Sequence, residues 1–192
     1  IRDSAGTRLV ERHGRALASF FHQRVPGQAV ADLVQDTFMV LCASRDRIRS
    51  HASFRSFAFG VARRKLLEHS RRRKVASLDE AMPNEPPCDD PSATTLMDGK
   101  FKKDLAVNAL RRLPLDDQIL LELHDHQDLK RRELADIFDV PMGSIGGRVH
   151  RARKRLQHIV ETLSDNPGDV DSTETSLHAY WASVHERWRS SA

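Results

Sequence analysis

The residues with the clearest chemical potential are basic side chains that recur at helical spacing around residue 150. Apolar residues occupy positions 145, 149, 152 and 156, so a helix here would bury one face and present the cations on another. Guanidinium and ammonium groups on one helix face bind phosphates and, in the major groove, base edges. The predicted DNA-contacting residues of this helix are Ser144, Arg148, Arg151, Lys154 and Arg155.

A short helix and a turn are predicted just before this basic helix. Leu134, Ile137 and Phe138 give the short helix an apolar face, and the segment 140–143 (VPMG) predicts a tight turn. Ser144 is suited to cap the helix that follows. This order is typical of a helix-turn-helix, whose second helix enters the major groove. A surface helix with a solvated charge stripe is the alternative, which the preceding helix, turn and cap disfavour.

Catalytic and metal-binding sites are not predicted. His124-Asp125-His126 contains metal-ligand residue types, but positions two apart on a helix point to different faces, and no third ligand is suitably spaced. There is no glycine-rich phosphate loop and no nucleophile motif. The two cysteines, Cys42 and Cys88, form no disulfide framework, and no apolar run is long enough to span a membrane. We therefore expect a cytoplasmic, non-enzymatic protein without cofactor or metal.

The charge of the chain is unevenly distributed over its 192 residues, although the formal net charge is only +4. Basic residues cluster at 63–74 and 148–155, whereas 75–99 and 159–176 contain acids but no lysine or arginine. Two basic blocks separated by acidic spacers predict two polyanion-binding modules.

Helical periodicity dominates, so we predict an all-α fold of two small helical domains. Residues 1–74 form the first domain and 101–163 the second. Residues 75–100, rich in Pro, Asp, Ser and Thr, form an acidic flexible linker between them. Residues 164–192 comprise an acidic segment and a C-terminal amphipathic helix, expected to dock on the chain's own domains or on a partner. One face of that helix carries Leu177, Tyr180, Trp181, Val184 and Trp188.

The second domain resembles region 4 of the sigma-70 family, in its extracytoplasmic-function (ECF) group. The similarity covers residues 110–157 and includes Leu113-Pro114 and the segment 150–156 (HRARKRL). A typical family sequence for this part is LSYEEIAEILGVPVGTVKSRLHRARKRL. The resemblance implies that the basic helix binds the −35 element of a promoter.

The first domain resembles region 2 of the same family. The segments that match are 32–38 (DLVQDTF), 53–57 (SFRSF), 61–63 (VAR) and 71–73 (RRR). The family docks its DLVQ segment on the RNA polymerase clamp, which implies polymerase-binding roles for Asp32, Leu33, Gln35 and Asp36. The rest of region 2 binds and opens the −10 element, which implies DNA-binding roles for Phe59, Arg63, Arg64, Arg71, Arg72 and Arg73. For Phe59, stacking on an extruded base and packing in the core are both open.

The resemblance implies a sigma factor that contacts the clamp and flap of core RNA polymerase and starts transcription at promoter DNA. It also implies an anti-sigma factor as a candidate regulator. The alternative is a conventional helix-turn-helix regulator that acts without polymerase. That alternative accounts for residues 132–157 but leaves the motifs of the first domain unexplained.

The sequence departs from the family in both domains. Gly146-Gly147 stands where the family usually has Lys and Ser, which predicts weak base readout and a helix less stable by about 1 kcal/mol per glycine. Arg64 replaces an asparagine, so the promoter sequence is not inferred. Segment 29–32 (AVAD) replaces the acidic DAED. We hypothesise that a Ser/Thr kinase restores the missing charge at Thr37, an ordinary helix-packing threonine being the alternative.

Overall fold

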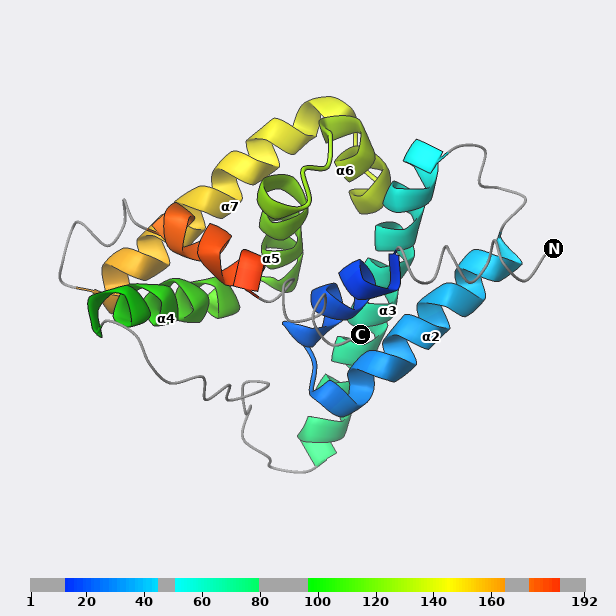
Figure 1. Cartoon of the computed structure of the whole chain (residues 1–192), viewed down its shortest axis with the longest axis horizontal. Helices are drawn as coiled ribbons and strands as arrows, with labels where there is room; N and C mark the ends of the chain where they lie inside the picture. The colour runs from blue at the N-terminus through cyan, green and yellow to red at the C-terminus, as the bar shows by residue number, and fades with distance from the viewer. Residues whose placement is uncertain (1–12, 45–50, 80–96, 165–172, 184–192) are drawn as a thin grey trace. The chain divides into compact units, whose positions relative to one another are not determined.

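A computed structural model describes residues 13–44, 51–79, 97–164 and 173–183. These residues form helices and contain no strand, which confirms the all-α fold (Figure 1). The chain divides into two compact units, one within residues 1–90 and one within residues 91–186. No helix in the described part is long and apolar enough to cross a membrane.

The first unit contains a helix over residues 13–22, then α2 (Gly27–Ala43) and α3 (His51–Asp79). Pro26 precedes α2 and sets its start, because its fixed φ of −56° suits the residue before a helix. Aromatic side chains fill the space between the helices: the ring of Phe20, on the first helix, meets that of Phe59, on α3, edge-on at a centroid distance of 5.7 Å. The core also contains Leu17, Leu33, Phe38, Leu41, Phe54, Ala58, Val61 and Leu66.

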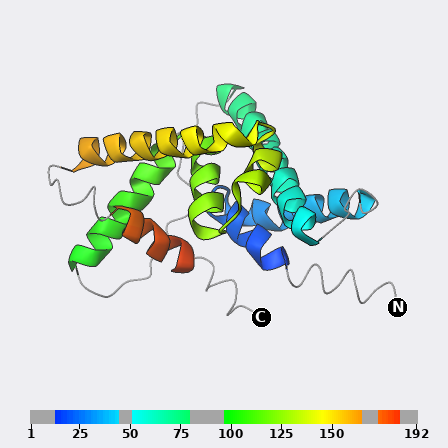
Figure 2. The same cartoon turned by 90° about the horizontal axis from the view of Figure 1, so that it is seen from above.

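The second unit is built around the long helix α7 (Met142–Leu163). Figures 1 and 2 both show α4 (Met97–Arg112) and α5 (Leu115–Leu121) packed against it. The π-helical turn η2 (Glu122–His126) follows α5 directly, and α6 (Arg131–Phe138) also packs on α7. The predicted linker 75–100 is partly helical: α3 continues to Asp79 and α4 begins at Met97. Residues 80–96 lie outside the described part.

A tight turn joins α6 and α7 as predicted, but it is shorter than the predicted segment 140–143, because Met142 and Gly143 already belong to α7. Asp139 ends α6 in the left-handed conformation, with φ at 53°, which Asp tolerates better than most residues. Pro141 is the N-cap of α7, so the helix begins at Met142 and the predicted capping role of Ser144 is wrong. The Ser144 hydroxyl instead donates to the carbonyl of Pro141 at 2.8 Å, within the first turn of α7.

Candidate nucleic-acid interface

The helix α7 separates an apolar face from a cationic one. Its apolar side chains, at positions 145, 149, 152, 156 and 160, are buried in the core of the second unit. Arg151 and Lys154 are exposed, and Arg148 is half-buried. None of these three has a carboxylate partner among the residues that the structure describes, so their charges are available to a polyanion.

Arg155, the fourth predicted cation of α7, is held by its own unit. Its guanidinium hydrogen-bonds Asp117 of α5 at 2.5 Å while half of its side chain stays exposed. Asp117 lies in the first turn of α5, where a carboxylate also complements the helix dipole. Arg155 therefore joins α7 to α5. A phosphate that binds Arg155 has to compete with Asp117 for the guanidinium.

A second cationic surface follows α3 of the first unit. Arg64, Arg71, Arg72 and Arg73 are exposed, whereas Arg63 is half-buried. Burial, followed by the charges of Arg73 and Arg72, lowers the pKa of His69 below its usual value of 6.5. Arg73 and Arg72 therefore contribute to this lowering, although burial of the ring is its larger cause.

Phe59 belongs to the core and not to this surface. Its side chain is 3% exposed, and its ring meets that of Phe20 edge-on at 5.7 Å. A ring enclosed in this way cannot stack on an extruded base, so the DNA-binding role considered for Phe59 is wrong in this conformation. Phe54 is also buried, with the ring of His13 at 4.8 Å.

The predicted polymerase-binding residues of α2 divide into exposed and buried positions. Asp32 and Gln35 are exposed. Asp36 pairs with Lys65 of α3 at 3.4 Å, so part of its charge is used between the two helices. Leu33 is 7% exposed and forms part of the core, which corrects its assignment as a contact residue.

Thr37 is fully buried, with 0% of its surface exposed. Its hydroxyl donates to the carbonyl of Leu33, one helical turn earlier, at 2.7 Å. A kinase needs an accessible hydroxyl, and a phosphoryl group here would bring about two negative charges into the core. The structure therefore contradicts the hypothesis of a Thr37 phosphosite and supports the packing alternative.

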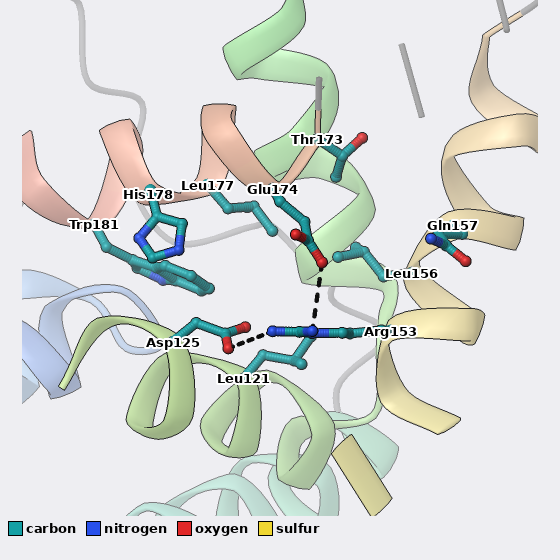
Figure 3. A pocket seen from close by; sticks show the side chains of 10 residues that line it. All are labelled: Leu121, Asp125, Arg153, Leu156, Gln157, Thr173, Glu174, Leu177, His178 and Trp181. Carbon is teal, nitrogen blue, oxygen red and sulfur yellow. Dashed lines mark hydrogen bonds and ion pairs between the residues drawn. The ribbon is translucent and has the colours of Figure 1, made fainter. Parts of the chain in front are cut away.

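The C-terminal helix docks on the second unit through two large apolar side chains. The helix covers residues 173–183, and its Leu177 and Trp181 are buried, the indole being 1% exposed. Figure 3 shows them facing Leu121 of α5 and Leu156 of α7. Of the two alternatives for this helix, docking on the chain's own domain is thus the one observed. Val184 and Trp188 lie outside the described residues.

A chain of charged groups reinforces this docking. Arg153 of α7 hydrogen-bonds Asp125 of η2 at 2.7 Å and pairs with Glu174 of the C-terminal helix at 3.5 Å (Figure 3). Asp125 also accepts a bond from His124 at 2.5 Å, and His126 faces the ring of Trp181 at 6.1 Å. The carboxylate of Asp125, in the segment His124-Asp125-His126, is thus engaged in an ion pair with Arg153. The described residues contain no cluster of three or more metal-ligand side chains.

Sequence reasoning did not identify Arg153 as a bridging residue. Its position in α7, between the apolar and the cationic faces, is a signal for such a role, because a boundary arginine can reach across to a neighbouring helix. The partners themselves lie 28 and 21 residues away and are not visible in the local pattern.

Comparison with known proteins agrees with this arrangement. Residues 9–75 match the profile of Sigma-70 region 2, and residues 103–156 match that of Sigma-70, region 4. The ECF RNA polymerase sigma-E factor of Escherichia coli K12 is 26% identical over 164 residues, which cover 81% of this chain and 86% of that protein. RNA polymerase sigma factor NccH of Alcaligenes xylosoxydans xylosoxydans is 27% identical over 162 residues, covering 80% and 86%.

Solved structures share the fold. The sigma factor RpoE of Bartonella quintana, in complex with the anti-sigma factor NepR, has a TM-score of 0.60 at 22% identity, covering 84% of this chain and 98% of that one. CnrH, in complex with the cytosolic domain of CnrY, has a TM-score of 0.59 at 23% identity, covering 84% and 91%. With regions 2 and 4 matched in order, the chain belongs to the sigma-70 family, as a sigma factor of its ECF group.

Proposed function

We propose that this chain binds core RNA polymerase and directs it to promoters, with α7 contacting the −35 element and α3 the −10 element. One observation carries the proposal: α7 buries its apolar face and leaves Arg148, Arg151 and Lys154 without carboxylate partners among the described residues. A helix of this kind after a tight turn fits the major groove. The exposed arginines of α3 fit the phosphates of the −10 region.

Contact with the polymerase clamp is proposed for α2. Asp32 and Gln35 are exposed on the part of α2 that matches region 2. A contact between the second unit and the polymerase flap completes the attachment. Leu33 and Thr37 have no place in this surface because both are buried.

Regulation by an anti-sigma factor is also proposed. Two structural relatives were solved as complexes, RpoE with the anti-sigma factor NepR and CnrH with CnrY. In this chain the C-terminal helix covers Leu121 and Leu156 of the second unit, so a partner for that surface must displace it. A kinase acting on Thr37 is not part of the proposal.

Run-off transcription with purified bacterial core RNA polymerase and a pool of promoter fragments tests the function. We expect specific transcripts from the full chain and loss of them from an Arg148→Ala, Arg151→Ala double variant. Arg112→Ala, an exposed arginine of α4, is the matched control and should transcribe like the parent. The full chain is needed because ending it at Leu163 would uncover Leu121 and Leu156.

Run-off transcription, together with measurements of core-polymerase binding and duplex binding, separates a sigma factor from a conventional helix-turn-helix regulator. Specific transcripts together with core binding would establish the sigma role. A chain that binds duplex DNA but neither binds core polymerase nor yields transcripts would be a conventional helix-turn-helix regulator, and the proposal would be wrong.

A further inference from the structure

The C-terminal helix, which covers residues 173–183, lies beyond the residues that match the region 4 profile. That profile ends at residue 156, and the apolar residues under the helix, Leu121 and Leu156, both belong to it. An apolar face of the matched domain is therefore closed by a segment that is added to this domain.

The helix contacts this face through one stripe of side chains. Thr173, Leu177 and Trp181 recur every four residues and are buried, whereas the positions between them are exposed or half-buried. The helices beneath have a core of their own, since α4, α5 and α6 each pack directly on α7. The C-terminal helix can thus separate from the second unit as one element and leave the helix-turn-helix assembled.

The fit between the helix and the face is incomplete. A cavity of about 30 Å³ remains between them (Figure 3). The indole N–H of Trp181 is buried and has no acceptor among the residues that the structure describes, which costs free energy that exposure to water returns. Glu174 is 3.5 Å from Arg153 and its side chain is 63% exposed, so water screens this ion pair. These features favour an occupant that a partner can displace.

The covered face is distinct from the DNA-binding face. Leu156 belongs to the apolar side of α7, whereas Arg151 is exposed on its cationic side. Without the C-terminal helix, Leu121 and Leu156 form an apolar face with the charged Asp125 and Arg153 beside it. Such a face fits an amphipathic helix of a partner, and its occupation leaves the cations of α7 available to DNA.

We propose that the C-terminal helix is an autoinhibitory cover: it occupies the face through which the second unit binds core RNA polymerase, and polymerase displaces it. The inference rests on the proposed function, to which it adds a regulatory contact. A subunit that joins polymerase to a promoter needs a protein-binding face beside its DNA-binding face, and the covered face meets that need. The cover lowers the apparent affinity for polymerase, because only chains with an open face can bind.

Hydrogen–deuterium exchange of the full chain, measured by mass spectrometry with and without purified core RNA polymerase, tests the displacement. Backbone amides of residues 173–183 should exchange faster in the complex, since a displaced helix loses the contacts that protect it. Amides of α5 and α7 should stay protected, because polymerase takes the place of the helix. Unchanged or slower exchange of residues 173–183 in the complex would overturn the inference.

Affinity for core polymerase, measured with full-length variants, provides the second arm. Trp181→Ala removes the largest apolar contact of the helix, so binding should tighten roughly tenfold. Glu174→Gln removes only the ion pair with Arg153 and should tighten binding about twofold. Its matched control, Glu161→Gln, removes an exposed carboxylate of α7 and should bind like the parent. Parental affinity in both Trp181→Ala and Glu174→Gln would contradict the cover.

Two further outcomes complete the design. If Trp181→Ala does not fold, Glu174→Gln and the exchange measurement still decide the question. If the parent binds core polymerase and directs run-off transcripts while residues 173–183 stay protected, the sigma function stands and the autoinhibitory cover is wrong. A parent chain that neither binds core polymerase nor directs transcription would contradict both proposals.

Discussion

Arg153 of α7 donates a hydrogen bond to Asp125 of η2 at 2.7 Å, across 28 residues of sequence. Asp125 is mostly buried, with 13% of its side chain exposed, so the arginine supplies a partner that water largely cannot. The pair lies under the C-terminal helix, whose Glu174 contacts the same guanidinium. Arg153 thus links α7 to both η2 and the C-terminal helix, in addition to the apolar contacts of Leu177 and Trp181.

Removal of this carboxylate should weaken the second unit. Asp125→Ala leaves Arg153 with the exposed Glu174 alone, and we expect the free energy of unfolding to fall by about 1–3 kcal/mol. Urea denaturation followed by circular dichroism measures the change. Asp136→Ala, an exposed acid of α6, is the control and should stay within about 0.5 kcal/mol of the parent. Equal effects from the two variants would show that the buried pair contributes nothing.

Truncation of Trp181 should have a larger effect. Trp181→Ala empties a fully buried site against Leu121 and Leu156, so we expect a loss of about 3–5 kcal/mol. Trp181→Phe keeps much of the apolar volume and should lose clearly less. The exposed Thr175→Ala serves as the control for the helix itself. Thermal unfolding that is indifferent to Trp181→Ala would contradict the docking of this helix.

A charge-mimicking substitution at Thr37 should destabilise the first unit. Thr37→Glu places a carboxylate where the hydroxyl is fully buried, and we expect a loss of several kcal/mol together with weaker core-polymerase binding. Thr37→Val keeps the shape and removes one hydrogen bond to Leu33, so it should cost about 1 kcal/mol. A Thr37→Glu protein with parental stability and tighter polymerase binding would revive the phosphorylation hypothesis.

The lowered pKa of His69 predicts how the stability of the first unit depends on pH. Burial and the charges of Arg73 and Arg72 favour the neutral ring in the folded state, so the unfolded chain takes up the proton first. The stabilising contribution is complete above about pH 6.5 and is lost as the pH falls toward the lower folded pKa. Denaturation curves measured between these limits should show the decline, and His69→Gln should flatten it.

Duplex binding should move the same titration in the opposite direction. Phosphates that neutralise Arg72 and Arg73 remove one cause of the shift, so the pKa of His69 should rise when DNA is bound. The imidazole proton resonance followed by NMR across the pH range reports it. An unchanged midpoint in saturating duplex would mean that DNA does not contact these arginines.

Local patterns were enough to predict the helix-turn-helix. The apolar spacing of α7 and the turn at Pro141 depend on residues close in sequence, and periodicity reports such features well. The family resemblance assigned Asp32 and Gln35 to a binding surface, and both side chains are exposed on α2. The same motif assigned Leu33 to the surface, because it does not say which face of α2 meets α3.

Features that depend on long-range packing were not predictable. Phe59 is buried because neighbouring helices cover it, and its own local sequence is compatible with either state. The bridge from Arg153 to Asp125 joins segments with no shared periodicity. From the sequence, Gly146 predicts only weaker base readout by α7. Nothing in the sequence indicates that Arg131 of α6 lies close to this glycine.

The π-helical turn has a consequence for comparing this protein with its relatives. Gln127 donates its backbone N–H to Glu122, five residues earlier, so η2 holds one residue more than an α-helical turn. Deleting one residue there would restore α-helical spacing and rotate everything after it by about 100° around the helix axis. A relative with an ordinary turn is therefore aligned correctly only with a single-residue gap inside a helix, a place where alignments rarely open one. Without that gap, the carboxylate that holds Arg153 would be matched to a residue facing another direction.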